Sequence, residues 1–187
     1  MGYADEYLKD TELTEESILR DLEILAAYYG DMELEGQVLP AREEFPMPTL
    51  VAGLEPDDRD RPRIMSHSFL PLDTETAEFT KYLQFYSELP CPVEELDRAT
   101  LLEAICRLNN RLPLGTCVLA DPNPAFGQPA KAAVRYVQGF PLEGAVDQGV
   151  FTEDLFLFDL SCDLVTTVLD GLNDGLSLDE AFAQIGR

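Results

Sequence analysis

Few residues of this chain have the types and spacing that chemistry requires, and its single histidine is the first to consider. His67 lies between Ser66 and Ser68 in the run Met-Ser-His-Ser-Phe. A serine and a histidine can act as nucleophile and general base when their side chains meet. This run is typical of a strand, however, and adjacent strand residues point to opposite faces. We therefore expect a histidine at the surface or on an edge strand, and a hydrolase built on it is the weakest hypothesis.

Metal, redox and acid/base sites are not indicated by the remaining residues. The acidic segment from Asp170 to Glu180 does not keep the register of a calcium-binding loop. Adjacent carboxylates such as Glu94 and Glu95 do not face one another on a helix. We expect no catalytic residue, no metal site and no cofactor, and we interpret the cysteines as small apolar residues. They stand singly in the sequence, at Cys91, Cys106, Cys117 and Cys162.

The charge of the chain limits the classes of molecule that it can bind. Its 187 residues include 36 acidic and 13 basic ones, which gives a net charge of -23. This charge repels nucleic acids and anionic membranes, and it either favours basic partners or serves solubility alone. The basic cluster Arg59, Arg61 and Arg63 alternates with aspartates, so we expect a solvated loop there. No run approaches the roughly 18 apolar residues of a membrane span, and the first residues do not resemble a secretory signal, which predicts a cytoplasmic protein.

Hydrophobic periodicity predicts the helices that must position any site. Thr14 is a suitable N-cap for a helix that ends at Gly30. A second helix is expected from Thr74 or Thr76 to Leu89, where Pro90 ends it. The last begins in the capping box formed by Ser177 and Glu180. Further helices are predicted from about residue 97 to 112 and over 151–172.

Two strand pairs are expected between these helices. Residues 49–54 and 63–70 are predicted to pair antiparallel, as are 115–120 and 131–139. The proline-rich loop 121–130 that joins the second pair is either functional or a tolerated insertion, and we favour the tolerated insertion. The fold class is therefore α+β, with an antiparallel twisted sheet packed by helices. We expect one domain over 1–187, in which 1–44 form a helix and a proline-rich lead-in and 45–187 form the core.

The segment 151–172 has more apolar surface than one sheet face requires. One apolar stripe starts at Phe151, and a second, containing Leu160, lies on another side of the helix. An acidic ridge of Asp159, Asp163 and Asp170 separates them. The second stripe needs another partner, either the last helix or another chain. The residues predicted to contact a partner are Phe151, Leu157, Leu160, Leu164, Asp159 and Asp163.

Several local sequences resemble those of one family. They are the segment Leu108 to Gly115, the strand from Thr116 to Ala120, the run Ala133-Val134-Arg135-Tyr136 and the acidic, apolar helix around Glu153-Asp154-Leu155. With the order of elements, they resemble the type III secretion chaperones and YbjN-like proteins over most of the chain from about residue 45 onward. The resemblance implies a chaperone-like fold in a small, acidic, cytoplasmic protein, usually a homodimer, without cofactor or catalytic residues. It also implies that a partner polypeptide is held against an apolar surface of sheet and helix.

Three functional hypotheses follow from the sequence. The leading one is a non-enzymatic binding module that holds a partner polypeptide or a second copy of itself. The second is an acidic mimic of nucleic acid, which would present Asp159, Asp163 and Asp170 as an exposed ridge to a basic protein. The third is the hydrolase that uses His67.

Overall fold

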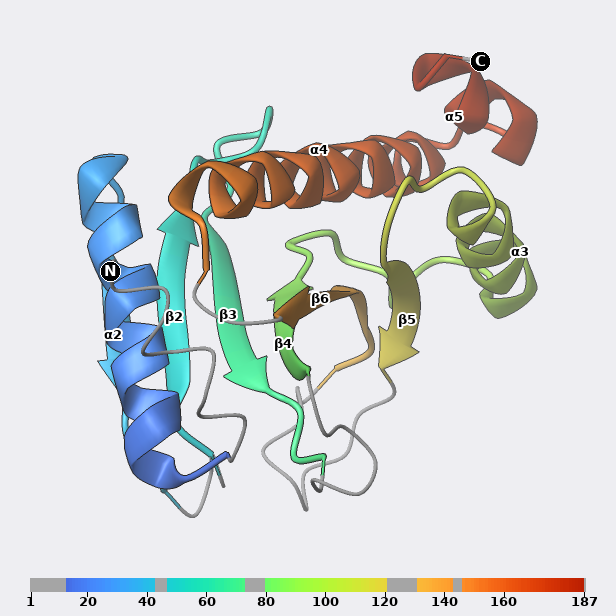
Figure 1. Ribbon diagram of the computed structural model, residues 1–187. Coiled ribbons are helices and arrows are strands. Elements are labelled where there is room, and N and C mark those ends of the chain that lie inside the picture. The colour runs from blue at the N-terminus through green and yellow to red at the C-terminus, as the bar shows by residue number, and fades with distance from the viewer. Residues whose placement is uncertain (1–12, 43–46, 73–79, 121–130, 143–145, 187) are drawn as a thin grey trace. The chain divides into compact units, whose positions relative to one another are not determined.

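The computed structural model describes residues 13–42, 47–72, 80–120, 131–142 and 146–186 (Figure 1). These residues form an antiparallel sheet of six strands in the order β1-β2-β3-β4-β6-β5. The predicted α+β class with an antiparallel sheet is therefore confirmed. The strands are β1 (Gly36–Leu39), β2 (Thr49–Leu54), β3 (Arg63–Phe69), β4 (Lys81–Glu88), β5 (Thr116–Ala120) and β6 (Ala133–Leu142). The helices are α2 (Glu15–Asp31), α3 (Arg98–Asn109), α4 (Gln148–Asn173) and α5 (Leu178–Gln184).

The chain forms two compact units. Unit 1 takes its described residues from 1–54, 64–86 and 139–154, and unit 2 from 55–63, 87–138 and 155–187. The single domain expected from the chain length stays a prediction. Within the described ranges, no helix is both long and apolar enough to cross a membrane.

In unit 1, helix α2 packs on β1 and β2 (Figure 1). Thr14 caps it in a reciprocal pair with Ser17, which satisfies backbone groups that the first turn leaves open. Its buried apolar side chains recur every three or four residues and are Ile18, Leu22, Leu25 and Tyr29. The helix predicted over residues 14–30 is thus confirmed.

The centre of unit 1 is an aromatic cluster that contains His67. The histidine is fully buried, with its ring centroid 4.4 Å from that of Phe85 and 5.9 Å from that of Phe151. Its Nε2 lies 2.6 Å from the hydroxyl oxygen of Tyr29. The predicted surface or edge position is wrong, because β3 lies between β2 and β4 and its inward alternation includes His67.

The helix predicted between residues 74 and 89 is also wrong in its described part. Residues 81–88 form strand β4, in which buried and more exposed side chains alternate. Leu83 and Phe85 point inward while Tyr82 is exposed. The prediction used the helical spacing of Tyr82, Leu83 and Tyr86, although this aromatic-rich run fits a period of two equally well. Residues 73–79 lie outside the described part of the chain.

Strand β1 was not predicted. It has four residues and pairs antiparallel with β2, in a register that aligns Gly36 with Ala52. So short a run carries no distinct alternation, and the following Pro40 favours a loop. The other expected pair in this region is confirmed, because β2 and β3 are neighbours in the sheet.

In unit 2, helix α3 starts after Asp97, whose side chain accepts a hydrogen bond from the Thr100 amide. The helix predicted from about residue 97 is therefore confirmed. β5 and β6 pair antiparallel as predicted, and the loop 121–130 lies outside the described residues. Gly115 precedes β5 with a φ of 69°, and a Cβ atom there would lie 2.6 Å from the Tyr136 hydroxyl. Glycine is therefore required at this entry to the strand.

The buried His67 makes the stability of the protein depend on pH. Burial lowers the pKa of His67 from 6.5 to about 3. An imidazolium would add a second N–H donor, and among the described residues the Nδ1 atom has no hydrogen-bond partner. Because the unfolded chain binds this proton and the folded chain does not, the stabilisation is fully present above pH 6.5. It is lost as the pH falls from about 6.5 towards 3, by about 1.4 kcal/mol per pH unit.

We expect the wild-type protein to lose about 2 kcal/mol more stability between pH 7 and pH 5 than His67→Phe does. Urea unfolding at the two pH values measures the difference. Carboxylates titrate in both proteins, so the comparison isolates the histidine. Equal losses in the two proteins would show that the pKa of His67 is not lowered in the folded state.

Candidate binding surface on helix α4

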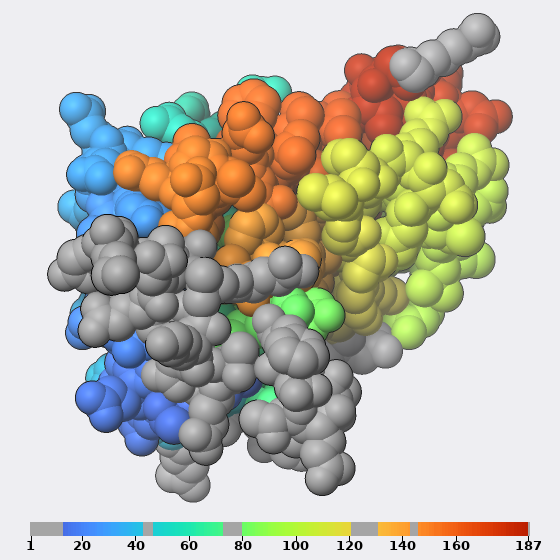
Figure 2. Space-filling view, in the orientation of Figure 1, coloured from blue at the N-terminus to red at the C-terminus, as the bar shows by residue number. Residues whose placement is uncertain are grey.

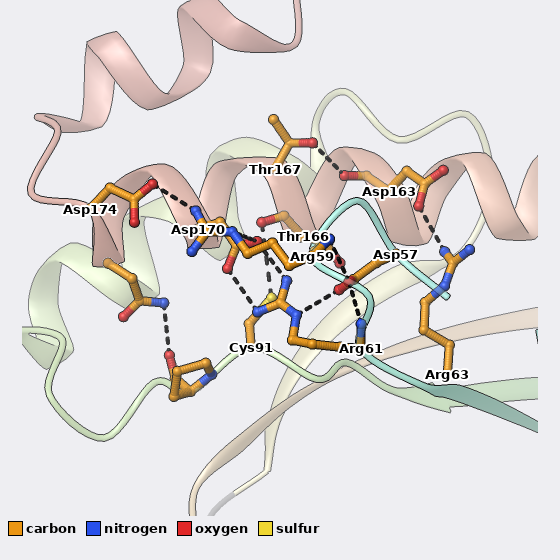
Figure 3. Close-up of polar contacts among 12 residues, drawn as sticks. Asp57, Arg59, Arg61, Arg63, Cys91, Asp163, Thr166, Thr167, Asp170 and Asp174 are labelled. Carbon is orange, nitrogen blue, oxygen red and sulfur yellow. Dashed lines mark hydrogen bonds and ion pairs between the residues drawn. The ribbon is translucent and has the colours of Figure 1, made fainter. Parts of the chain in front are cut away.

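The polar side of α4 in unit 2 is bound by arginines from the segment 59–63 (Figure 3). Arg63 has a side chain only 3% exposed, and its Nη1 lies 2.7 Å from Asp163 Oδ1 and 2.9 Å from Asp159 Oδ1. Its Nε donates a hydrogen bond to the Glu55 carbonyl oxygen at 2.7 Å. A guanidinium buried in this way requires such partners, because an unpaired charge in the interior is strongly destabilising.

Two more arginines of this segment converge on Asp170. Arg61 bridges Asp57 and Asp170, with N···O distances of 2.7 Å and 2.5 Å. Arg59 Nε lies 3.0 Å from the same Asp170, and its Nη2 lies 2.6 Å from Asp174. The predicted solvated loop is therefore wrong for Arg61 and Arg63, whose side chains are 21% and 3% exposed, whereas the Arg59 side chain stays 44% exposed. Sequence alone showed alternating charges, whereas the aspartates that bind these arginines include residues about 100 positions away on α4.

The environment shifts the acidity of these aspartates in opposite directions. Burial would raise the pKa of Asp57, but hydrogen bonds from the backbone and side chain of Arg61 outweigh it and hold the pKa below its ordinary value. Burial raises the pKa of Asp159 and Asp163 more than the nearby Arg63 lowers it. Burial therefore opposes the ionisation of Asp159 and Asp163, while the neighbouring Arg63 favours it.

An apolar stripe faces outward next to this network. Phe156 is 69% exposed and Leu160, one helical turn later, is 42% exposed. Residues four apart on a helix are neighbours on its surface, so the two side chains form one patch. Leu157 and Leu164 extend it as half-buried side chains. We call these four residues, with Asp159 and Asp163, the α4 surface; the orange part of α4 is visible in the space-filling view (Figure 2).

The residues predicted to contact a partner differ in how exposed they are in the structure. Phe151 is fully buried in the aromatic cluster of its own chain and presents no surface to a partner. Leu160 is exposed as expected. Phe156 was missed by the prediction, although its position four residues before Leu160 was a sufficient signal.

The acidic ridge expected on α4 is not presented as a row of exposed carboxylates. Asp170 is only 6% exposed and is held by Arg59 and Arg61. Asp159 and Asp163 keep side-chain exposures of 31% and 51% while paired with Arg63. The geometry therefore gives little support to the nucleic-acid mimic.

A small polar hollow lies beside the exposed carboxylate of Asp163. Its volume is about 160 Å³. Four carboxylates and one guanidinium are part of its wall, from Asp57, Asp58, Arg59, Asp163 and Asp170. The walls suit the cationic end of a lysine or arginine side chain better than an anion.

The cysteines are mostly interior residues. Burial raises the pKa of Cys91 and of Cys117 to about 12, so both are protonated thiols at neutral pH. Cys162 is buried as well, whereas Cys106 is exposed on α3. In the part of the chain that the structure describes, no group of three or more histidine, cysteine or acidic residues is arranged to hold a metal ion.

Comparisons with known proteins give no family for this chain. No protein-family model matches the sequence, and no curated protein matches it. The functional proposal therefore rests on the side chains described above.

We expect Asp170→Asn to destabilise unit 2. The substitution keeps the shape of the side chain but removes the charge that binds Arg61 and Arg59, and it leaves those guanidinium groups partly unpaired near the interior. The expected loss is about 2–3 kcal/mol in the free energy of unfolding. Urea denaturation measures it.

Asp174→Asn is the matched control, because Asp174 lies one turn later and also binds Arg59, yet its side chain is 57% exposed. Its effect should stay within about 0.5 kcal/mol. Equal effects of the two variants would mean that the buried network contributes no more than a surface ion pair.

Proposed function

We propose that this chain is a non-enzymatic protein-binding module that holds a basic partner polypeptide on the α4 surface. One observation carries the proposal. Phe156 exposes 69% of its surface next to the half-exposed Leu160 on a helix whose opposite side belongs to the core. Large aromatic side chains placed this way typically become the buried anchors of protein interfaces.

The energy available from this patch suits a modest interaction. Burying an aromatic or leucine side chain fully contributes roughly 1.5–3 kcal/mol. Phe156 and Leu160 are the most exposed members of the patch, and the half-buried Leu157 and Leu164 add less. Since association itself has a large entropic cost, contacts outside the patch must complete a stable complex.

The charge of the chain selects the chemistry of the partner. A net charge of -23 attracts cationic proteins over distance and opposes acidic ones. Locally, the exposed carboxylate of Asp163 lines the polar hollow and lies at one margin of the apolar patch. An amphipathic segment with leucine-like side chains beside lysine or arginine meets both features. The resemblance to secretion chaperones and YbjN-like proteins, with its expected cytoplasmic location, agrees with this proposal.

A second copy of the chain is the other candidate occupant. The apolar patch is compact and could meet itself across a two-fold axis, as in most homodimers. Such a dimer would bring two strongly acidic chains together, so its stability should rise with salt as the repulsion is screened. The basic partner is favoured because its attraction needs no such screening.

We expect Phe156→Asp to weaken the binding of a short amphipathic peptide of leucine and lysine by at least about tenfold. The variant removes the aromatic anchor and places a charge in the patch. Isothermal titration calorimetry with the purified chain gives the affinity. A matched peptide of leucine and glutamate should not bind measurably.

Leu102→Asp provides the control for this experiment. Leu102 is an exposed leucine on α3, 47% accessible and in the same unit, and its replacement should leave the affinity unchanged. The proposal fails if both variants lose affinity equally, or if the wild-type chain does not distinguish the basic from the acidic peptide.

Leu160→Asp separates the two candidate occupants. Light scattering should show a monomeric wild-type chain at low salt, with any dimer increasing at high salt. Any such dimer should be lost in Leu160→Asp, because an aspartate would be buried in the contact. A dimer that persists in this variant would exclude α4 from the self-association interface.

A further inference from the structure

We propose that the outer edge of β1 in unit 1, to which no other described strand is paired, accepts an extended, basic segment of another polypeptide as an additional strand. This site is independent of the α4 surface and uses different residues. Within the described ranges, β1 is the outermost strand on its side of the sheet and is hydrogen-bonded to β2. An outermost strand presents unpaired backbone groups that a further strand can bind.

The register shows which backbone groups face outward. The Glu35 carbonyl oxygen accepts a hydrogen bond from the Gly53 amide, so the backbone of Glu35 is directed toward β2. In an antiparallel ladder the direction alternates along the strand. Gln37 therefore shares the inward direction, as its pairing with Val51 requires. The amides and carbonyls of Gly36 and Val38 are directed outward, away from β2.

A groove with a volume of about 610 Å³ lies at this strand. It is lined by residues from α2, from β1 and its lead-in, and from β2 and β3. Most of these side chains are apolar or small, and Ile64 is 60% exposed. The apolar lining includes Ala26, Leu34, Val51, Ala52 and Ile64. A strand added beside β1 could place alternate side chains in this groove.

Two glycines open the groove. Gly30 lies in the last turn of α2 and Gly53 lies inside β2, positions where glycine weakens a helix or a strand. A Cβ atom built at either residue would meet no described atom within 4 Å. Neither glycine is therefore required by packing or by a positive φ angle. The open space at Gly53 therefore belongs to the groove and is available to a side chain of a bound segment.

The charges around the groove identify the occupant as basic. Glu35 lines the groove and is exposed, and Asp31 and Glu33 just before it are exposed as well. Pairing with the same edge of a second copy would bring two sets of these carboxylates together, which is destabilising. A segment that alternates apolar residues with lysine or arginine meets all three requirements. Its backbone can bond to β1, its apolar side chains can enter the groove, and its cationic side chains can pair with the carboxylates.

The probe is a short synthetic peptide of alternating valine and lysine, titrated into the full chain. Gly53→Val should weaken its binding by at least about tenfold, because the new side chain fills the groove. The same variant should fold normally, since valine favours strands and its Cβ has space. Gly30→Ala fills the groove from α2 and keeps the test valid if Gly53→Val folds poorly.

Gly139→Val is the matched control. Gly139 lies in β6, a Cβ there also meets nothing within 4 Å, and it is not part of the groove lining. Its replacement should leave the peptide affinity unchanged, and so should Phe156→Asp, which tests the α4 surface. Loss of binding in Phe156→Asp alone would overturn the β1 site without affecting the proposed function.

Amide hydrogen exchange tests the strand addition directly. Bound peptide should slow exchange at Gly36 and Val38, whose amides face outward, and leave Gln37 between them nearly unchanged. Equal binding of a valine and glutamate peptide would overturn the basic chemistry. Unchanged exchange at both outward amides would overturn strand addition. A dimer that Gly53→Val abolishes would assign the edge to a second copy instead.

Discussion

The pairing of buried arginines with aspartates of α4 is the constraint on which the rest of unit 2 depends. Arg63 continues the inward alternation of β3, so its guanidinium enters the interior and needs anionic partners there. Arg61 imposes the same requirement on Asp57 and Asp170. These contacts hold the side of α4 that carries Asp159, Asp163 and Asp170 against the arginines of the segment 59–63. The apolar stripe that includes Phe156 is then left facing outward.

This constraint also changes how the charge of the chain should be understood. A net charge of -23 suggests a surface with many unpaired carboxylates. Several aspartates, however, form ion pairs with the arginines of the segment 59–63. Asp170 is the clearest case, because it is nearly buried and bound by two guanidinium groups. The carboxylates that remain exposed set the long-range attraction for basic proteins, while local affinity depends on burying apolar side chains.

The sequence predicted the features that depend on local signals. The caps at Thr14 and Ser177 define two helix starts correctly, because capping involves residues three positions apart. Long-range pairing was not accessible: Arg63 binds a residue 100 positions away, and His67 is buried against Tyr29 and Phe151, which are distant from it in sequence. The β4 error has a local origin, since its aromatic-rich run fits a helical spacing and a period of two equally well.

The two proposed surfaces differ in the physics that would recognise a partner. On α4, affinity comes from removing an exposed ring and a leucine from water, so it tolerates different partner sequences with similar apolar side chains. At β1, backbone hydrogen bonds carry the interaction, and the groove opened by Gly30 and Gly53 selects side chains at alternate positions. Glycines that weaken their own helix and strand without a packing reason fit a groove kept open for the side chains of another chain. Their replacement should therefore stabilise the isolated chain while closing the site, which is the behaviour of residues retained for binding rather than for folding.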